Sequence, residues 1–500
     1  MVTPRIYAQD QKKAAVFREH KAPTLNLIRP SDESYELWEN FMLMQKANNG
    51  EAAAQHELGI RYFIGRGFGL DTVKSAYWIQ KAADQDFVIA RYNIAVFLNN
   101  GWGVAWNPFK AFEQFQYAAQ QGMPEAEYVY GSILTDNLVV QQDWSEAYRW
   151  IRKSADAGYQ PAKDALVEFE KRGFSARVDS AGSPVKRSPL ADSSLVISQR
   201  SLKPVLLDFG EENAADEDEL SFLKEMLRKG SPELKNALGI SKLDADKLVA
   251  DSTLVRLIQD AAEVGSPEAL AVLGRFREKG IAVRKDLIAA AIEYLRAVRL
   301  EFPRAPALIL HLIQDKKFVQ QVHTLARQGN ADAEFVCAGL VSVGLDAELP
   351  QQEATQLLKN SAAQHNSQAL IELGLCYYSG RGVELDKQKA SDLWFEAALL
   401  GSREAQIRFA AMKIIGNAAS KDYGQLIQTL DTASRKGSLL AEVALAHCYE
   451  TGRGVALDTT EAVRLYRQSA YRGSQTAYYA LKKMYDDLRP NSPKFHVKEE

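Results

Sequence analysis

Apolar residues recur at steps of two, three and four along short segments, and these segments return at a fixed interval. Steps of this size place the apolar side chains on one face of an α-helix, and a fixed period indicates a repeat architecture. The units open at alanines 36 residues apart: Ala54, Ala90 and Ala126, then Ala333, Ala369, Ala405 and Ala441. Two more units open at Leu234 and Ala269, and a shortened one lies between Ala305 and Ala333.

A small residue stands five positions into the first helix of each unit, for example Gly59, Gly131 and Gly374. Glycine inside a helix costs about 1 kcal/mol relative to alanine. Its return in one register therefore predicts that another helix approaches closely at this point.

The link between the two helices of a unit has its own signature. A glycine that can end a helix in the left-handed conformation comes first, at Gly65, Gly101, Gly280, Gly380 and Gly452. A side chain that can cap the second helix follows, at Asp71, Asn107, Asp143, Asp251, Asp286, Asp386, Asp422 and Asp458. Each unit is thus predicted to be helix, turn, helix and stop. A phosphate-binding glycine loop would instead follow a β-strand, so these glycines indicate turns and not a nucleotide site.

The periodicity divides the chain into five parts. We predict an N-terminal extension at 1–32, an N-terminal repeat array at 33–173, a flexible linker rich in Ser, Pro and charge at 174–215, a C-terminal repeat array at 216–489 and a disordered tail at 490–500. The predicted fold is all-α: an α/α superhelical solenoid of 36-residue helix-turn-helix repeats, in two arrays joined by the linker.

Composition and charge narrow the class of protein. Apolar residues make up 46% of the chain and charged residues 25%, as in a folded protein, and the net charge of −3 argues against nucleic acid as a partner. The N-terminal segment lacks the apolar core of a secretory signal, and no run approaches the roughly 20 apolar residues that membrane insertion needs. The three cysteines form no zinc or disulfide pattern, and we expect a cytoplasmic protein without metal or cofactor.

The recurring pattern A-x-x-x-L-G-x-x-Y, then G-x-G-V, an Asp, and A-x-x-W/Y-x-x-x-A-A before a Gly, resembles the Sel-one-like repeat (SLR) family. This resemblance implies antiparallel helix pairs stacked into a right-handed superhelix, and a non-enzymatic adaptor or scaffold that assembles other proteins. Some members of the family are cysteine-rich secreted proteins with penicillin-binding or β-lactamase activity. The alternative that the resemblance implies is therefore a hydrolase of cell-wall or β-lactam-like substrates, although this chain lacks the regular cysteine pairs.

Partner-binding residues are sought where side chains differ between units. The fourth position of the first helices holds Glu57, Asn93, Glu372 and Arg408, which we predict to form an exposed row along the concave face. Trp102 and Trp106 lie in an aromatic cluster that is denser than in the sister units, and an exposed Trp is a candidate interface anchor. The apolar segment Ser201–Gly210 in the linker is a further docking candidate. The partners we expect are proteins or peptides, and no catalytic residue is predicted.

Overall fold

The computed structural model describes residues 33–171, 252–346, 349–416 and 423–497. Regular structure within these ranges is entirely helical, which confirms the predicted fold class. The N-terminal extension, the linker with Ser201–Gly210 and residues 234–251 of the unit predicted at Leu234 lie outside the described residues. The described residues form two compact units, one with residues up to 171 and from 482 onward, the other with residues 252–481.

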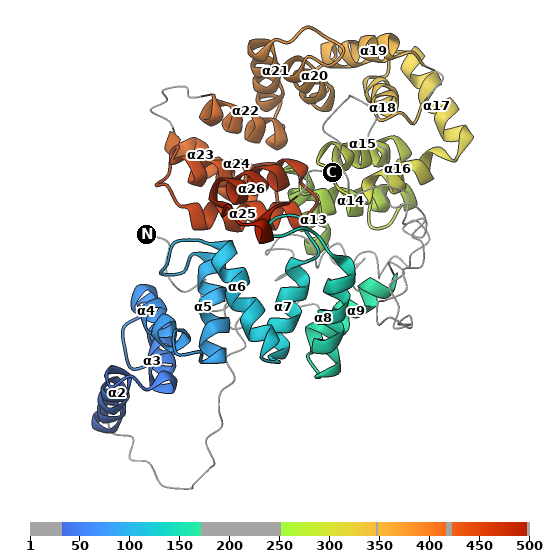
Figure 1. Ribbon diagram of the computed structural model, residues 1–500. Coiled ribbons are helices and arrows are strands. Elements are labelled where there is room, and N and C mark those ends of the chain that lie inside the picture. Colours follow the sequence, from blue (N-terminus) through green and yellow to red (C-terminus); the bar gives the residue numbers. More distant parts are fainter. Residues whose placement is uncertain (1–32, 172–251, 347–348, 417–422, 498–500) are drawn as a thin grey trace. The chain divides into compact units, whose positions relative to one another are not determined.

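In the first unit, helices that follow one another along the chain pack side by side (Figure 1). The repeat helices of this unit, which we call the N-terminal array, are α2 (Glu33–Asn48), α3 (Ala52–Ile64), α4 (Thr72–Ala83), α5 (Val88–Asn100), α6 (Pro108–Gln120), α7 (Pro124–Ile133), α8 (Trp144–Asp156) and α9 (Gln160–Lys171). Each predicted repeat here is one antiparallel helix pair.

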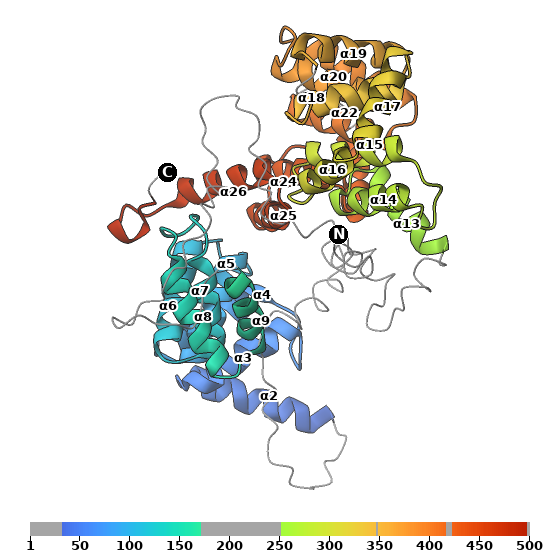
Figure 2. The same ribbon diagram turned by 90° about the vertical axis from the view of Figure 1, so that its right-hand side faces the viewer.

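The second unit, which we call the C-terminal array, continues the same stacking over more helices (Figure 2). These are α13 (Ser252–Glu263), α14 (Pro267–Lys279), α15 (Leu287–Arg299), α16 (Ala305–Ile313), α17 (Lys316–Arg327), α18 (Ala331–Ser342), α19 (Gln351–Ala363), α20 (Ser367–Ser379), α21 (Lys387–Leu399), α22 (Arg403–Ile415), α23 (Tyr423–Arg435), α24 (Leu439–Thr451), α25 (Thr459–Tyr471) and the start of α26 (Gln475–Leu488). The shortened unit α16–α17 lets α18 pack directly against α15.

The helix ends form as the sequence predicts. The predicted helix-ending glycines have a positive φ, from 67° at Gly101 to 74° at Gly280, and each donates its N–H to the last turn of the preceding helix. The predicted capping side chains that are described accept a hydrogen bond from a backbone N–H of the second helix; they are Asp71, Asn107, Asp143, Asp286, Asp386 and Asp458. Local chemistry thus sets the length of each helix.

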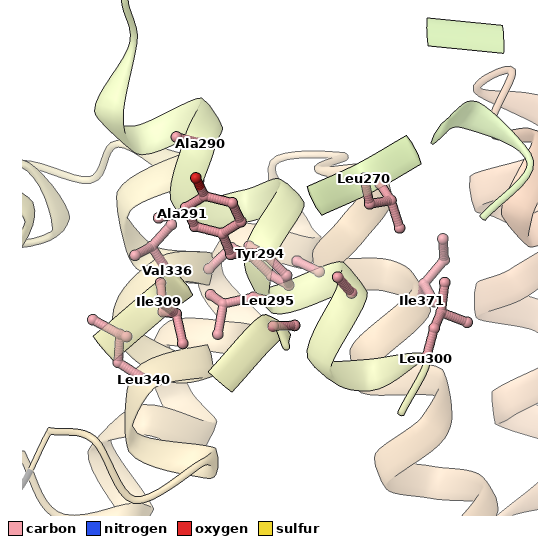
Figure 3. Packing of buried hydrophobic residues seen from close by; sticks show 14 of the residues in the cluster. Leu270, Ala290, Ala291, Tyr294, Leu295, Leu300, Ile309, Val336, Leu340 and Ile371 are labelled. Carbon is pink, nitrogen blue, oxygen red and sulfur yellow. The ribbon is translucent and has the colours of Figure 1, made fainter. Parts of the chain in front are cut away.

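The small residue in the first helix marks a close approach between helices, as predicted. A Cβ at Gly374 would lie 2.3 Å from Nε1 of Trp394, and a Cβ at Gly59 would lie 2.6 Å from Cγ1 of Ile79. Gly274 meets the ring of Tyr294, which is fully buried in the core shown in Figure 3. These glycines therefore allow the two helices of one repeat to pack in contact.

Two predictions about the end of the chain are wrong. Residues 490–497 were predicted as disordered tail, but Pro493–Phe495 forms a 3₁₀ helix and Phe495 is only 3% exposed. Residues 482–489 were assigned to the C-terminal array, but they belong to the first unit. We call residues 482–497 the C-terminal segment. It is ordered because its aromatic side chains pack on the N-terminal array.

Candidate protein-interaction surfaces

In the N-terminal array, the start of each first helix carries a row of rings. We call it the aromatic row: His56, Phe87, Tyr92, Tyr128 and Tyr159. The rings of His56 and Phe87 lie 5.5 Å apart, and those of Tyr128 and Tyr159 lie 5.6 Å apart. Tyr92 is buried, whereas the other four are partly exposed. The row joins adjacent repeats and still offers aromatic surface to a ligand.

The aromatic row is electrically neutral near neutral pH. Burial lowers the pKa of His56 to about 4, with a smaller opposing effect from Glu57. Burial raises the pKa of the Tyr92 phenol, and the neighbouring Tyr159 and Glu125 raise it further. The row therefore offers neutral rings and hydroxyl groups to a partner.

The predicted residues Glu57 and Asn93 differ in exposure. The Glu57 side chain is 46% exposed and pairs with Arg61 on its own helix at 2.9 Å. Asn93 is only 4% exposed, and its Nδ2 donates a hydrogen bond to Nε2 of His56 at 2.8 Å. The prediction of an exposed row is therefore wrong at Asn93, because this side chain joins two adjacent repeats.

The stability of the N-terminal array should fall between about pH 6.5 and pH 4. The folded state holds His56 neutral down to about pH 4, whereas the unfolded chain takes up the proton near pH 6.5. Stability is therefore complete above pH 6.5 and is lost as the pH falls, by about 3 kcal/mol in total. Urea unfolding of the wild type and of His56→Tyr, which puts the ring of the sister repeats in its place, measures this difference. Equal pH profiles for the two proteins would contradict the expectation.

In the C-terminal array, the predicted residues Glu372 and Arg408 take part in a buried ion-pair cluster. We call it the Glu404 cluster: Glu404, Arg296, Arg299, Arg408 and Glu372. The Glu404 carboxylate is 2.9 Å from Nη2 of Arg299, 3.1 Å from Nη2 of Arg408 and 3.3 Å from Nη2 of Arg296. Arg299 also reaches Glu372 at 3.2 Å. The cluster joins helices α15, α20 and α22.

The charged side chains of the Glu404 cluster are buried, and their burial affects the pKa of Glu404. The side chain of Glu404 is 1% exposed and that of Arg408 9%. Burial alone would raise the pKa of Glu404, but the three guanidinium groups hold it well below its usual range. The prediction of an exposed Arg408 is therefore wrong, and Glu372 is bound within the same cluster. These side chains hold the array together.

A second buried ion-pair cluster joins the two ends of the C-terminal array. Arg472 binds Glu268 through two nitrogens, at 2.8 and 2.7 Å, and Glu442 at 2.7 Å. Glu268 and Arg472 are 204 residues apart in the sequence. Burial alone would lower the pKa of Arg472, but the two carboxylates raise it. The repeats α14–α15 and α24–α25, which lie near the two ends of the described part of this array, are therefore held in direct contact.

The tryptophans of the predicted aromatic cluster lie in different environments. Trp102 is partly exposed and packs its ring 5.5 Å from that of Phe63. Trp106, which was also a predicted partner-binding residue, is only 6% exposed, as expected for a ring that packs within the fold. The ring of Tyr485, from the C-terminal segment, lies 5.1 Å from it and covers it. Sequence reasoning missed this contact because the two rings are far apart in the chain.

The three cysteines do not have the properties of a nucleophile that the hydrolase alternative could use. A nucleophilic cysteine needs a lowered thiol pKa, whereas burial raises the pKa of Cys337 to about 12 and those of Cys376 and Cys448 to about 11. These thiols are packing residues of the first helices. Among the described helices, none has the length and apolar content needed to span a bilayer.

The stacked helix pairs define the chain as an α-solenoid repeat protein. Six segments match the Sel1 repeat model, which confirms the resemblance; they are residues 52–87, 88–123, 124–159, 267–297, 367–402 and 439–474. The chain is thus an α-solenoid that carries Sel1 repeats.

Several known proteins are similar to parts of the chain. Chitin synthase regulatory factor 3 of Schizosaccharomyces pombe is 30% identical over 146 residues, which are 29% of this chain and 15% of that protein. A protective antigen of uropathogenic Escherichia coli with an SLR fold is 21% identical with a TM-score of 0.30, over 91% of this chain and 84% of that one. A Sel1 repeat protein from Oxalobacter formigenes is 28% identical with a TM-score of 0.25, over 26% of this chain and 98% of that one.

Proposed function

We propose that the chain is a non-enzymatic cytoplasmic scaffold that binds protein or peptide partners on the concave face of its N-terminal array. Sel1 repeat proteins serve in protein–protein interaction, and a regulatory factor is among the similar proteins. A repeat scaffold offers an extended surface whose side chains vary from unit to unit. This function needs no reacting groups.

One observation favours the N-terminal array over the C-terminal one. The aromatic row leaves His56, Phe87, Tyr128 and Tyr159 partly exposed. At the equivalent helices of the C-terminal array, Glu372 and Arg408 are occupied by the Glu404 cluster. Tyrosine supplies both contact area and a hydrogen-bonding group, and it is enriched among residues that dominate binding. Glu57 and Trp102, both partly exposed, stay predicted contacts.

Quantitative affinity capture from native cells tests the proposal. The bait proteins are the full wild-type chain, the Tyr128→Ser/Tyr159→Ser variant and the matched control Tyr77→Ser. Tyr77 is a 52% exposed tyrosine on the second helix α4. We expect the double variant to lose at least about 90% of a captured partner, as for removal of binding hot spots, and the control to retain it.

The same experiment can contradict the proposal. Equal capture by all three baits, with matching circular dichroism melts, would show that the aromatic row is not part of the binding site. Turnover of a β-lactam or cell-wall substrate by the purified wild type would support the hydrolase alternative instead.

A further inference from the structure

The C-terminal segment packs on an aromatic surface at the edge of the N-terminal array, outside the aromatic row. We call this the edge surface: Trp106, Phe109 and Phe112, with the loop residues Leu138 and Val139. Phe495 inserts its ring 5.1 Å from that of Phe109 and 6.1 Å from that of Phe112. Tyr485 covers Trp106. Both anchors of the segment are only 3% exposed.

An arginine fixes the segment between its two aromatic anchors. Nη2 of Arg489 donates a hydrogen bond to the carbonyl of Leu138 at 2.8 Å, and Nη1 donates to that of Val139 at 3.1 Å. The guanidinium carbon also lies 5.3 Å above the ring of Phe109. Two aromatic anchors and one cation at fixed spacing define a recognition pattern, Tyr-x₃-Arg-x₅-Phe.

The repeats that receive the segment differ from their sisters at the points of contact. Trp106 stands where other units have Leu70, Leu385 and Leu457, which are 54%, 57% and 66% exposed. The third repeat lacks the paired glycines, and its loop presents two carbonyl groups to Arg489. These three turns leave the position uncovered, so the general repeat structure does not require a cover there.

The fit of the segment is incomplete. The Trp106 indole N–H is buried and has no acceptor among the described residues. A buried donor without an acceptor reduces the net free energy of binding. The contacts include rings, one arginine and one lysine, Lys494, which reaches Gln116 at 2.9 Å. Such contacts resemble those of a bound peptide.

We propose that the edge surface is a segment-binding site and that residues 482–497 are its releasable ligand, bound within the same chain. The ligand class is a short peptide with the pattern Tyr-x₃-Arg-x₅-Phe. A ligand in the same chain acts at an effective concentration that does not depend on dilution, so it excludes a free peptide of equal affinity that is present below that concentration. The edge surface is therefore closed in the resting chain and open after release. This proposal does not depend on the aromatic row.

Fluorescence anisotropy with a labelled synthetic peptide of residues 482–497 tests the site. The receptors are the full wild-type chain and the full-length variant Arg489→Ala/Phe495→Ala, whose own segment is disabled. We expect the variant to bind the peptide at least about 10-fold more tightly than the wild type does. A peptide with Phe495→Ala should bind more than about 10-fold more weakly, whereas a control peptide with Asp487→Ala, an exposed position, should bind like the parent.

Three outcomes would overturn the proposal. The first is no binding to the variant when its thermal melt matches that of the wild type. The second is equal binding to wild type and variant, which would show that the site is not filled within the chain. The third is a wild-type dimer that forms with rising concentration and is lost with Phe495→Ala, which would make a second copy the source of the segment.

Hydrogen exchange on the wild type provides a measurement that needs no variant. A releasable ligand opens locally, so amides of residues 482–497 should exchange at least about 10-fold faster than those of α5 and α6. Exchange of the segment only together with the whole N-terminal array would show a permanent structural element and would contradict release.

Discussion

Replacing Glu404 by glutamine is expected to destabilise the C-terminal array by about 3–5 kcal/mol. The change leaves three buried guanidinium groups, those of Arg296, Arg299 and Arg408, without their shared carboxylate. Breaking a buried ion pair on one side costs this much because the remaining charge stays out of water. Hydrogen exchange of amides in α15 and α22 measures the loss.

The pH dependence of the same variant provides a second readout. The folded-state pKa of Glu404 lies well below the ordinary 4.5, so its stabilisation is complete above that pH and declines as the pH falls below it. The glutamine variant should lack this part of the acid sensitivity. The control is Glu384→Gln, an exposed carboxylate in the same array, which should change stability by less than about 0.5 kcal/mol. A small effect of Glu404→Gln would show that the Glu404 cluster does not stabilise the C-terminal array.

Replacing Arg472 by methionine is expected to cost a similar 3–5 kcal/mol at neutral pH. It leaves the carboxylates of Glu268 and Glu442, which are 2% and 1% exposed, buried without their cation. The loss should shrink as the pH falls, because burial raises the pKa of Glu442 and protonation then removes its charge. Chemical unfolding of the full chain at pH 7 and pH 4.5 measures the difference.

Two further variants separate this effect from a general effect of mutation. Arg464→Ala, on the helix α25 that Arg472 directly follows, removes a half-exposed arginine and should change stability by about 0.5 kcal/mol or less. The triple variant Arg472→Met/Glu268→Gln/Glu442→Gln should recover much of the loss, because no charge stays buried. If the triple variant is as unstable as Arg472→Met, packing and not charge explains the effect.

The helix pairs could be predicted from the sequence because they depend on neighbouring residues. Gly65 ends α3 with a backbone conformation that glycine favours, and Asp71 caps α4 three residues before the N–H it binds. Gly374 indicates a close helix contact, since a side chain would overlap Trp394. The residues that end, cap and pack these helices all lie within one repeat, so the sequence of a single repeat is enough to predict its structure.

The candidate interaction surfaces were harder to predict than the helix pairs, because they depend on contacts between residues that are distant in the sequence. Arg408 has the same place in its repeat as the partly exposed Glu57, and its burial is set by Glu404 and by arginines of α15, more than 100 residues earlier. Trp106 is covered by a tyrosine more than 300 residues later. The 36-residue period describes how neighbours stack, but not where successive turns of the superhelix meet.

The contacts of Arg299 with Glu404 and of Arg472 with Glu268 restrict how this gene can evolve. An array held only by neighbour contacts can gain or lose one copy by tandem duplication or deletion, since the remaining copies keep their interfaces. One additional 36-residue copy between α15 and α22 would move Glu404 away from the buried Arg296 and Arg299. The copy number of this stretch is therefore constrained by charge pairing between distant repeats as well as by stacking.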